Sequence, residues 1–254
     1  MAAADGARAR APRPRQDFPS CAGQPLHLGA RSWGLLLLSV LAGFGLLLWA
    51  PLTGAWGQWL TRLLFVGLPL VCLAWLAGRK AWALFGPFGW REAAFAAAAA
   101  LLAIVASFAA ALGVGQFSTV APNPEVQASA SLAWPDFALQ LLSMAPQLLG
   151  EELLTILPFL ALLQLASTRL GWSRGRSIAL ALLGSTLLFS AAHLPTYDWN
   201  WGQCFGVIGA ARVVLTLAYI ATRNLWVSTG AHVLTDWTEF TLAFLMAGSG
   251  AAAD

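Results

Sequence analysis

The heptapeptide GEELLTI at residues 150–156 places two adjacent carboxylates, Glu151 and Glu152, inside a long apolar run. One acidic residue at the centre of a membrane helix costs roughly 2.5–3.5 kcal/mol, so an adjacent pair requires a compensating interaction. Outside the N-terminal tail the chain has two histidines, His193 and His232, and each lies in or at the end of an apolar segment. These side chains together predict a polar site buried among membrane helices.

The composition predicts an integral membrane protein. Of the 254 residues, 59% are hydrophobic and 10% are charged, which leaves too few polar residues to cover a large soluble core. The net charge of +3 does not indicate a nucleic-acid partner, because most Lys and Arg residues lie in tails and loops where membrane topology explains them. The three cysteines have no paired spacing, so neither a disulfide framework nor a zinc ribbon is expected.

The hydropathy pattern predicts an all-α fold, a polytopic transmembrane helical bundle of about seven spans. Seven apolar segments approach the roughly 20 residues that cross a bilayer: 33–52, 58–77, 93–114, 136–167, 177–193, 204–221 and 226–247. Basic residues occur in alternate loops, and the loops between them contain no Lys or Arg. The positive-inside rule therefore predicts seven crossings of the cell membrane, a cytoplasmic N-terminus and an external C-terminus.

The chain divides into four predicted regions. Residues 1–32 are rich in Ala, Pro and Arg and lack apolar periodicity, so we expect a disordered basic cytoplasmic tail. Residues 33–133 hold the N-terminal transmembrane helices, including the Ala-rich run 95–111, which is either lipid-facing or closely packed. Residues 134–247 form the helical core that carries the polar site. Residues 248–254 are a short C-terminal tail.

The fourth apolar segment is unusually long. As one helix, residues 136–167 would measure about 48 Å, whereas the hydrocarbon core is roughly 30 Å thick. Pro146 and Pro158 lie inside the segment, and each removes a backbone hydrogen bond. The pattern predicts either an interfacial portion before Pro146 and a kink near Pro158, or a helix that is simply tilted.

Several ionisable residues share the predicted membrane depth, and such groups face a bundle interior and pair with one another. They are Glu151, Glu152, His193, Arg212, His232, Asp236 and Glu239. Adjacent helical positions point about 100° apart, so one glutamate should face a cavity while the other pairs with a neighbouring helix. His232 and Asp236 are four residues apart and share a helix face.

These residue types suit the hydrolysis of a peptide bond. Burial disfavours the charged form of a carboxyl group, so a buried glutamate can accept a proton from water while an imidazole aligns that water. A second imidazole can donate to the oxyanion that forms. The same residues, Glu151, His193 and His232, could instead bind zinc, although no HExxH motif is present. A proton-coupled transporter or a non-catalytic scaffold would also contain buried charges, but the inverted repeats typical of transporters are absent from the sequence.

Three ordered motifs resemble those of the CPBP (CAAX prenyl protease and bacteriocin-processing, or ABI) intramembrane endopeptidases. Glu151-Glu152, Phe189 with His193, and His232 with Asp236 resemble EExxxR, FxxxH and HxxxN, and the resemblance covers roughly residues 134–247. It implies that Glu151 and His193 activate water, and that His232 and residue 236 stabilise the oxyanion, with no cofactor. The implied partners are the lipid bilayer and a membrane-associated peptide or protein substrate. A catalytically silent member, acting as a membrane scaffold or bacteriocin-immunity protein, is the alternative.

The sequence departs from these motifs at two positions. Ile156 replaces the arginine of EExxxR, and we expect Arg212 in the sixth segment to pair with Glu152 in its place, since either charge alone would be costly. Asp236 replaces the asparagine of HxxxN, and an ionised aspartate only accepts hydrogen bonds. It therefore stays protonated, or orients His232, or makes the site metal-binding or inactive.

The predicted topology places the two histidines at different depths. His193 precedes Pro195 at the outer end of the fifth segment, whereas His232 lies a few residues into the seventh segment from the inner side. For both to share a site, the fifth segment must end inside the membrane, or the sixth must be short and tilted.

Overall fold

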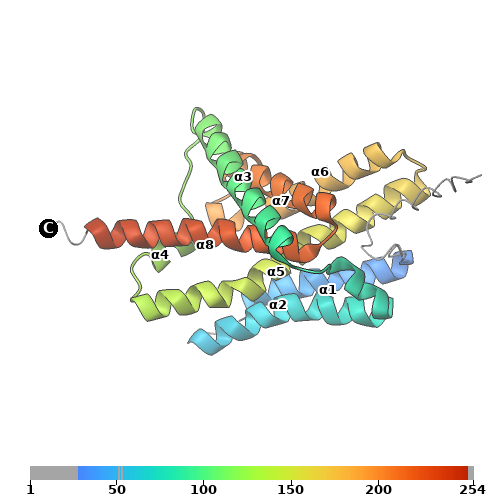
Figure 1. Cartoon of the computed structure of the whole chain (residues 1–254), viewed down its shortest axis with the longest axis horizontal. Coiled ribbons are helices and arrows are strands. Elements are labelled where there is room, and N and C mark those ends of the chain that lie inside the picture. The colour runs from blue at the N-terminus through green and yellow to red at the C-terminus, as the bar shows by residue number, and fades with distance from the viewer. Residues whose placement is uncertain (1–27, 51, 53, 251–254) are drawn as a thin grey trace, which may run out of the picture.

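The computed structural model describes residues 28–50, 52 and 54–250, which form helices and no strand. The α-helices are α1 (Ala30–Trp49), α2 (Gly54–Ala77), α3 (Trp90–Val114), α4 (Pro124–Ser129), α5 (Trp134–Gln164), α6 (Arg174–Ala192), α7 (Gly209–Thr222) and α8 (Leu225–Gly250). Short 3-10 and π-helical elements join them: η1 (Gly78–Leu84), η2 (Leu165–Arg169), η3 (Pro195–Tyr197) and η4 (Gly202–Ile208). The predicted all-α fold is confirmed (Figure 1).

Helix length and apolarity agree with a protein that crosses the bilayer several times. Within the described residues, six helices are long and apolar enough to span it: α1, α2 with η1, α3, α5 with η2, α6, and η4 with α7. The seventh predicted segment corresponds to α8, which is 26 residues long and carries Asp236 and Glu239. The chain is therefore an integral multi-pass membrane protein with about seven spans.

Helices extend into both predicted tails. Residues 30–32 already belong to α1, because the side chain of Gln164 accepts from the Leu28 amide at 3.4 Å and donates to its carbonyl at 2.7 Å. This bond to α5 orders the chain just before α1. At the other end α8 continues to Gly250. The remaining parts of the predicted tails, residues 1–27 and 251–254, lie outside the described residues.

Local sequence signals mark where several helices begin. Asn123 caps α4 by accepting from the Glu125 amide at 2.9 Å, and Pro124 occupies the first helical turn, where its missing donor is harmless. Pro135 has the same position in α5. The Glu92 carboxylate accepts from the Gly89 amide at 2.9 Å at the start of α3. These caps fix the ends of the helices that surround the polar site.

Helix α5 is the central element of the fold. It is a single α-helix of 31 residues with Pro146 and Pro158 inside it, and every residue from Gly150 to Leu160 is buried. It packs against α1, α2, α6 and α8, and it runs along much of the molecule's long axis in Figure 1. At Gly150 an added Cβ would lie 2.6 Å from the Phe65 ring, so α2 and α5 approach too closely there for any larger residue.

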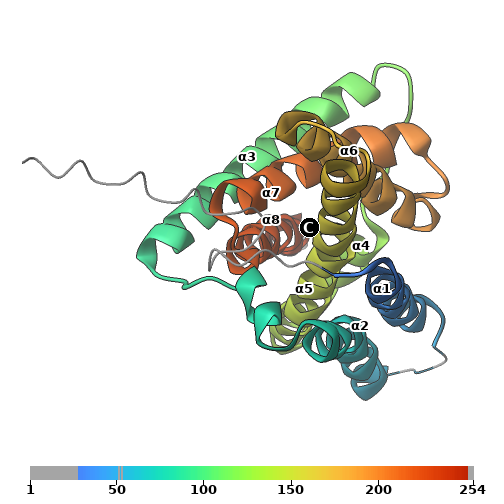
Figure 2. The same cartoon turned by 90° about the vertical axis from the view of Figure 1, so that its right-hand side faces the viewer.

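The Ala-rich helix α3 is closely packed along one face. Figures 1 and 2 show it crossing beside α7 and α8. Its small side chains pack there against Leu215, Ala218, Val227 and Ala231. The buried alanines on this face are Ala96, Ala99, Ala100 and Ala103, whereas the intervening Ala97 and Ala98 are exposed. Small residues permit a close approach of membrane helices, which explains the composition of this segment.

We expect Ala103→Leu to destabilise the protein, because Ala103 is fully buried between helices and the larger side chain would force them apart. Overpacking of this kind costs about 1–3 kcal/mol. The measurement is thermal unfolding in detergent micelles. Ala98→Leu, on the exposed face of the same helix, is the matched control and should change stability by less than about 0.5 kcal/mol. Equal losses for the two variants would contradict the packing described here.

Candidate active site

The two adjacent glutamates of α5 point to different partners. Glu152 is fully buried, and its Oε1 lies 2.6 Å from Arg212 Nη1 and 3.0 Å from His232 Nδ1. Glu151 lies on a less enclosed side, where its Oε1 accepts from Gln147 Nε2 at 3.0 Å and its Oε2 lies 3.8 Å from His232 Nε2. The side chains thus separate as the angle between adjacent helical positions requires.

The predicted pairing of Arg212 with Glu152 is present. Arg212 is fully buried on α7, and its guanidinium carbon also lies 4.9 Å from the centre of the Phe189 ring on α6. A carboxylate and a face of an aromatic ring both stabilise a cation. The arginine that the EExxxR motif would place at position 156 is therefore supplied from a neighbouring helix, and Ile156 itself is fully buried in the apolar core.

His232 on α8 lies between the two glutamates. Because the Glu152 carboxylate can only accept, Nδ1 of His232 donates to it at 3.0 Å. The opposite nitrogen, Nε2, then faces both Glu151 Oε2 at 3.8 Å and Asp236 Oδ1 at 3.7 Å. Glu152 therefore orients the imidazole, and Asp236 is an ionic neighbour of the other nitrogen at a distance too long for a hydrogen bond.

His193 follows the last residue of α6, where the chain leaves the helix. Its Nδ1 lies 2.9 Å from the Phe189 carbonyl and donates to it, so its Nε2 is left for another partner. The His193 ring packs on the Phe189 ring with centroids 4.5 Å apart, and the same phenylalanine meets the His232 ring edge-on at 6.2 Å. One aromatic side chain thus contacts both histidines.

The fifth and sixth segments differ in the length of their regular helix. Helix α6 ends at Ala192 after 19 residues, and the regular part of α7 has only 14 residues after the π-helical η4. At 1.5 Å per residue, the regular part of α7 is about 21 Å long, shorter than the hydrocarbon core. The π-helical η4 precedes it, and η4 and α7 together have 21 residues, enough to span the core. The sixth segment therefore has a short regular helix, whereas α6, at about 28 Å, is close to the thickness of the core.

The site is closed on the Glu152 side and more open on the Asp236 side. The Glu152 and Arg212 side chains have no exposed surface, whereas 12% of the Glu151 side chain and 25% of the Asp236 side chain are exposed. Glu239, which was predicted at the same depth, is exposed on α8. A substrate can reach Glu151 and Asp236 more easily than the buried ion pair.

Several residues beside the site were not predicted. Arg62 on α2 contacts Gln147, which precedes Glu151 by one helical turn and donates to it. An arginine inside the second apolar segment was the available sequence signal for this contact. Tyr197 in η3 was also missed, although it follows His193 by four residues.

Several carboxylates lie near Tyr197. Burial raises the pKa of Tyr197, and the carboxylates of Glu239, Asp236 and Glu151 raise it further. Its hydroxyl therefore remains protonated and is available as a hydrogen-bond donor on the open side of the site. The side chain is itself held by packing against Leu194 and Cys204.

The alternative zinc set does not assemble as a ligand group. Among the described residues, no three His, Cys, Asp or Glu side chains are grouped closely enough to hold a metal ion. The Nδ1 atoms of His193 and His232 are both engaged, by the Phe189 carbonyl and by Glu152. A zinc-binding histidine often donates its Nδ1–H in this way and binds the metal through Nε2, so it is the missing grouping of side chains, and not the Nδ1 contacts, that argues against a three-ligand zinc site in this arrangement.

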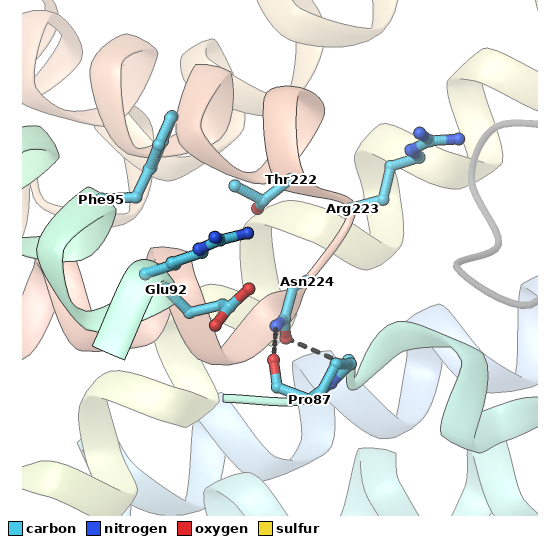
Figure 3. Close-up of a pocket in the computed structure, with 8 residues that line it drawn as sticks. Pro87, Glu92, Phe95, Thr222, Arg223 and Asn224 are labelled. Carbon is cyan, nitrogen blue, oxygen red and sulfur yellow. Dashed lines mark hydrogen bonds between the residues drawn. The ribbon is translucent and has the colours of Figure 1, made fainter. Parts of the chain in front are cut away.

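A cavity of about 350 Å³ lies away from these residues. It is lined by Gly86, Pro87, Arg91, Glu92, Phe95, Thr222, Arg223 and Asn224, between the start of α3 and the α7–α8 turn (Figure 3). Asn224 accepts from the Gly86 amide at 2.9 Å and donates to the Pro87 carbonyl at 2.8 Å, which ties this turn to the segment before α3. None of the predicted site residues lines this cavity.

Comparison with known proteins shows that the region carrying the site is similar to a protease family. Residues 133–238 match the model of the family described as Type II CAAX prenyl endopeptidase Rce1-like, which confirms the resemblance to the CPBP proteases. The matched region begins just before α5 and ends within α8, so it contains Glu151, His193, His232 and Asp236. No curated protein and no solved structure matches the chain significantly.

We expect Glu152→Met and Arg212→Met each to destabilise the protein strongly, because each leaves an uncompensated charge in the interior. Breaking a buried pair in this way costs about 3–5 kcal/mol. The double variant should lose clearly less than the sum of the single losses, since it removes both charges. Thermal unfolding of the four proteins in detergent measures this coupling, and strictly additive losses would show that the pair is not energetically linked.

Proposed function

We propose that this chain, whose residues 133–238 match the Rce1-like type II CAAX prenyl endopeptidase family, is an intramembrane endopeptidase. It hydrolyses a peptide bond of a membrane-associated protein or peptide, using a water molecule activated by Glu151. The observation that carries the proposal is the anchoring of His232. Because Nδ1 is held by Glu152, Nε2 faces Glu151 and Asp236 on the more open side of the site.

In the proposed first step, Glu151 Oε2 takes a proton from water as the water oxygen attacks the carbonyl carbon. His193, whose Nδ1–H is fixed by the Phe189 carbonyl, accepts a hydrogen bond from this water through Nε2. The carbonyl π electrons move to oxygen and form an oxyanion. Collapse of this intermediate breaks the C–N bond, and the proton on Glu151 passes to the leaving amine, which regenerates the carboxylate.

His232 is the proposed oxyanion donor. Since Nδ1–H already donates to Glu152, donation from Nε2 requires the doubly protonated ring. Carboxylate oxygens of Glu151, Glu152 and Asp236 all lie within 4 Å of its ring nitrogens, and opposite charges at this distance stabilise a second proton. We propose that Asp236 supports His232 in this way and does not donate to the oxyanion itself. The Tyr197 hydroxyl is a further donor on the same side.

A catalytically silent scaffold or immunity protein is the second candidate function. Two departures from the family motifs suggested it, but Arg212 compensates for Ile156 by pairing with Glu152. Asp236 remains as the one position that favours this alternative, because a second carboxylate near Glu151 competes for the same imidazole nitrogen. Measuring peptide cleavage by the Asp236 variants distinguishes a protease from a catalytically silent protein.

We expect Glu151→Gln and His193→Ala to lower cleavage about 100- to 10,000-fold, as loss of a general base does. Purified protein in liposomes is given two fluorescence-quenched peptides of one sequence that end in Cys-aliphatic-aliphatic-X, one farnesylated and one unmodified, and the products are identified by mass spectrometry. Glu92→Gln, which changes a carboxylate on α3, is the matched control. Cleavage of the farnesylated peptide alone would assign prenylated substrates.

Membrane peptide profiles of wild type, Glu151→Gln and His193→Ala extend this test beyond the chosen peptides. Identical profiles for the three proteins, together with unchanged cleavage of both peptides, would contradict the protease proposal. The same assay with a chelator examines the metal alternative. Cleavage that is lost on chelation and restored by zinc would replace the glutamate mechanism with a metal-dependent one.

Asp236→Asn and Asp236→Ala distinguish the roles of this residue. If the carboxylate stabilises the second proton of His232, both variants should lower kcat, by about 10-fold or more for a contact to a charged group. The Asn variant restores the family motif and provides amide donors. Unchanged or increased activity in Asp236→Asn would therefore exclude a required carboxylate, and activity gained from an inactive wild type would support the silent-member alternative.

A further inference from the structure

We propose that Arg62, on α2 and outside the matched family region, is a positioning residue that acts on Glu151 through Gln147. The inference rests on the proposed function, in which Glu151 is the base. Arg62 Nε donates to Gln147 Oε1 at 3.0 Å, and Gln147 Nε2 donates to Glu151 Oε1 at 3.0 Å. A continuous relay thus joins α2 to the carboxylate at the centre of α5.

The guanidinium is held in place by three different partners. Besides Nε on Gln147, Nη1 donates to the Ser143 hydroxyl, and Nη2 donates to Glu125 Oε1 at 2.8 Å from α4. Only 7% of the Arg62 side chain is exposed, and the planar guanidinium cannot turn without breaking several of these bonds. Ser143, Gln147 and Glu151 are spaced four residues apart on α5, so they form one stripe along which Arg62 lies.

The amide of Gln147 has one accepting oxygen and one donating amino group, which fixes which end bonds to Arg62 and which to Glu151. Arg62 can only donate, so it takes the carbonyl oxygen of Gln147 and leaves the amino group for Glu151. The amino group holds Glu151 Oε1, which leaves Oε2 on the side of His232. A hydrogen bond to the amide oxygen also polarises the amide and strengthens its N–H donation. Arg62 therefore selects which carboxylate oxygen is free to accept a proton from water.

The interposed amide also keeps the Arg62 guanidinium out of direct contact with Glu151. Arg212, in contrast, forms a direct ion pair with the neighbouring Glu152. Arg62 instead forms its ion pair with Glu125, so Glu151 receives one neutral donor and no arginine in direct contact. The two arginines thus hold adjacent glutamates in different ways, one by a direct ion pair and one through an amide.

The test is a double-mutant cycle measured by cleavage of the farnesylated and unmodified peptides in liposomes. Arg62→Met and Gln147→Met should each lower kcat about 10- to 100-fold, the range for a lost bond to a charged group, with KM changed less than about twofold. The double variant should be no worse than Gln147→Met alone, because Arg62 acts through Gln147. Arg62→Lys keeps one donor and should recover part of the loss. Arg91→Met, on α3, is the matched control.

Two outcomes would overturn the relay. In one, the fold-losses in kcat of the two single variants multiply in the double variant. In the other, Arg62→Met and Gln147→Met each retain wild-type kcat. Where Arg62→Met fails to fold, Arg62→Lys takes its place in the cycle, and Gln147→Met still tests the last bond because it keeps Arg62 with Ser143 and Glu125. Glu151→Gln separates the two proposals. If Glu151→Gln is inactive and the relay variants are unaffected, the relay alone fails, whereas an active Glu151→Gln overturns the proposed function.

A second readout does not depend on cleavage. Dicyclohexylcarbodiimide modifies protonated carboxyl groups in apolar surroundings, and mass spectrometry locates the modified glutamate. Loss of a donor to a carboxylate favours its protonated form, so Arg62→Met and Gln147→Met should both increase modification of Glu151 at least about threefold over wild type and Arg91→Met. Equal modification of Glu151 in all four proteins would overturn the relay even if no peptide is cleaved.

Discussion

The buried ion pair between Glu152 and Arg212 is the interaction on which the site depends. Both side chains are fully enclosed, so each charge is tolerable only beside the other. The pair joins α5 to α7, its carboxylate holds His232 of α8, and its guanidinium lies over Phe189 of α6. Four helices are thereby fixed in one relative position, and Glu151 is left on the more open side, facing Nε2 of the same imidazole.

The polar partners of the two adjacent glutamates come from helices that pack on opposite sides of α5. Adjacent glutamates on one helix point in different directions, so each needs its own polar partners. These partners can be present only if other helices pack on both sides of α5. Helices α7 and α8 surround Glu152, while α2 and α4 reach Glu151 through Arg62 and Gln147. The N-terminal helices, which lie outside the matched family region, therefore complete the polar surroundings of the site.

The sequence predicted what the bilayer and charge balance require. All seven apolar segments form helices, because backbone groups in lipid must be satisfied internally, and Arg212 was predicted because neither it nor Glu152 could remain alone. The Arg62 contact could not be predicted, since nothing local indicates that α2 lies against the Gln147 face of α5. The ordered start of α1 likewise depends on Gln164, which is 136 residues from Leu28 in the chain. Such contacts between distant segments are set by tertiary packing.

The ion pair has a different structural role when the arginine is at position 212 than it would have at position 156. An arginine at 156 would lie one helical turn from Glu152 and would satisfy the carboxylate within α5 alone. Arg212 satisfies it from α7, so the same charge pairing also links two helices, and position 156 becomes free for an isoleucine that is buried in the core. The loss of a motif residue is therefore not a loss of its physical role. Asp236 is the remaining departure from the motif, and its carboxylate, 3.7 Å from His232 Nε2, adds a charge that the motif asparagine would not bring.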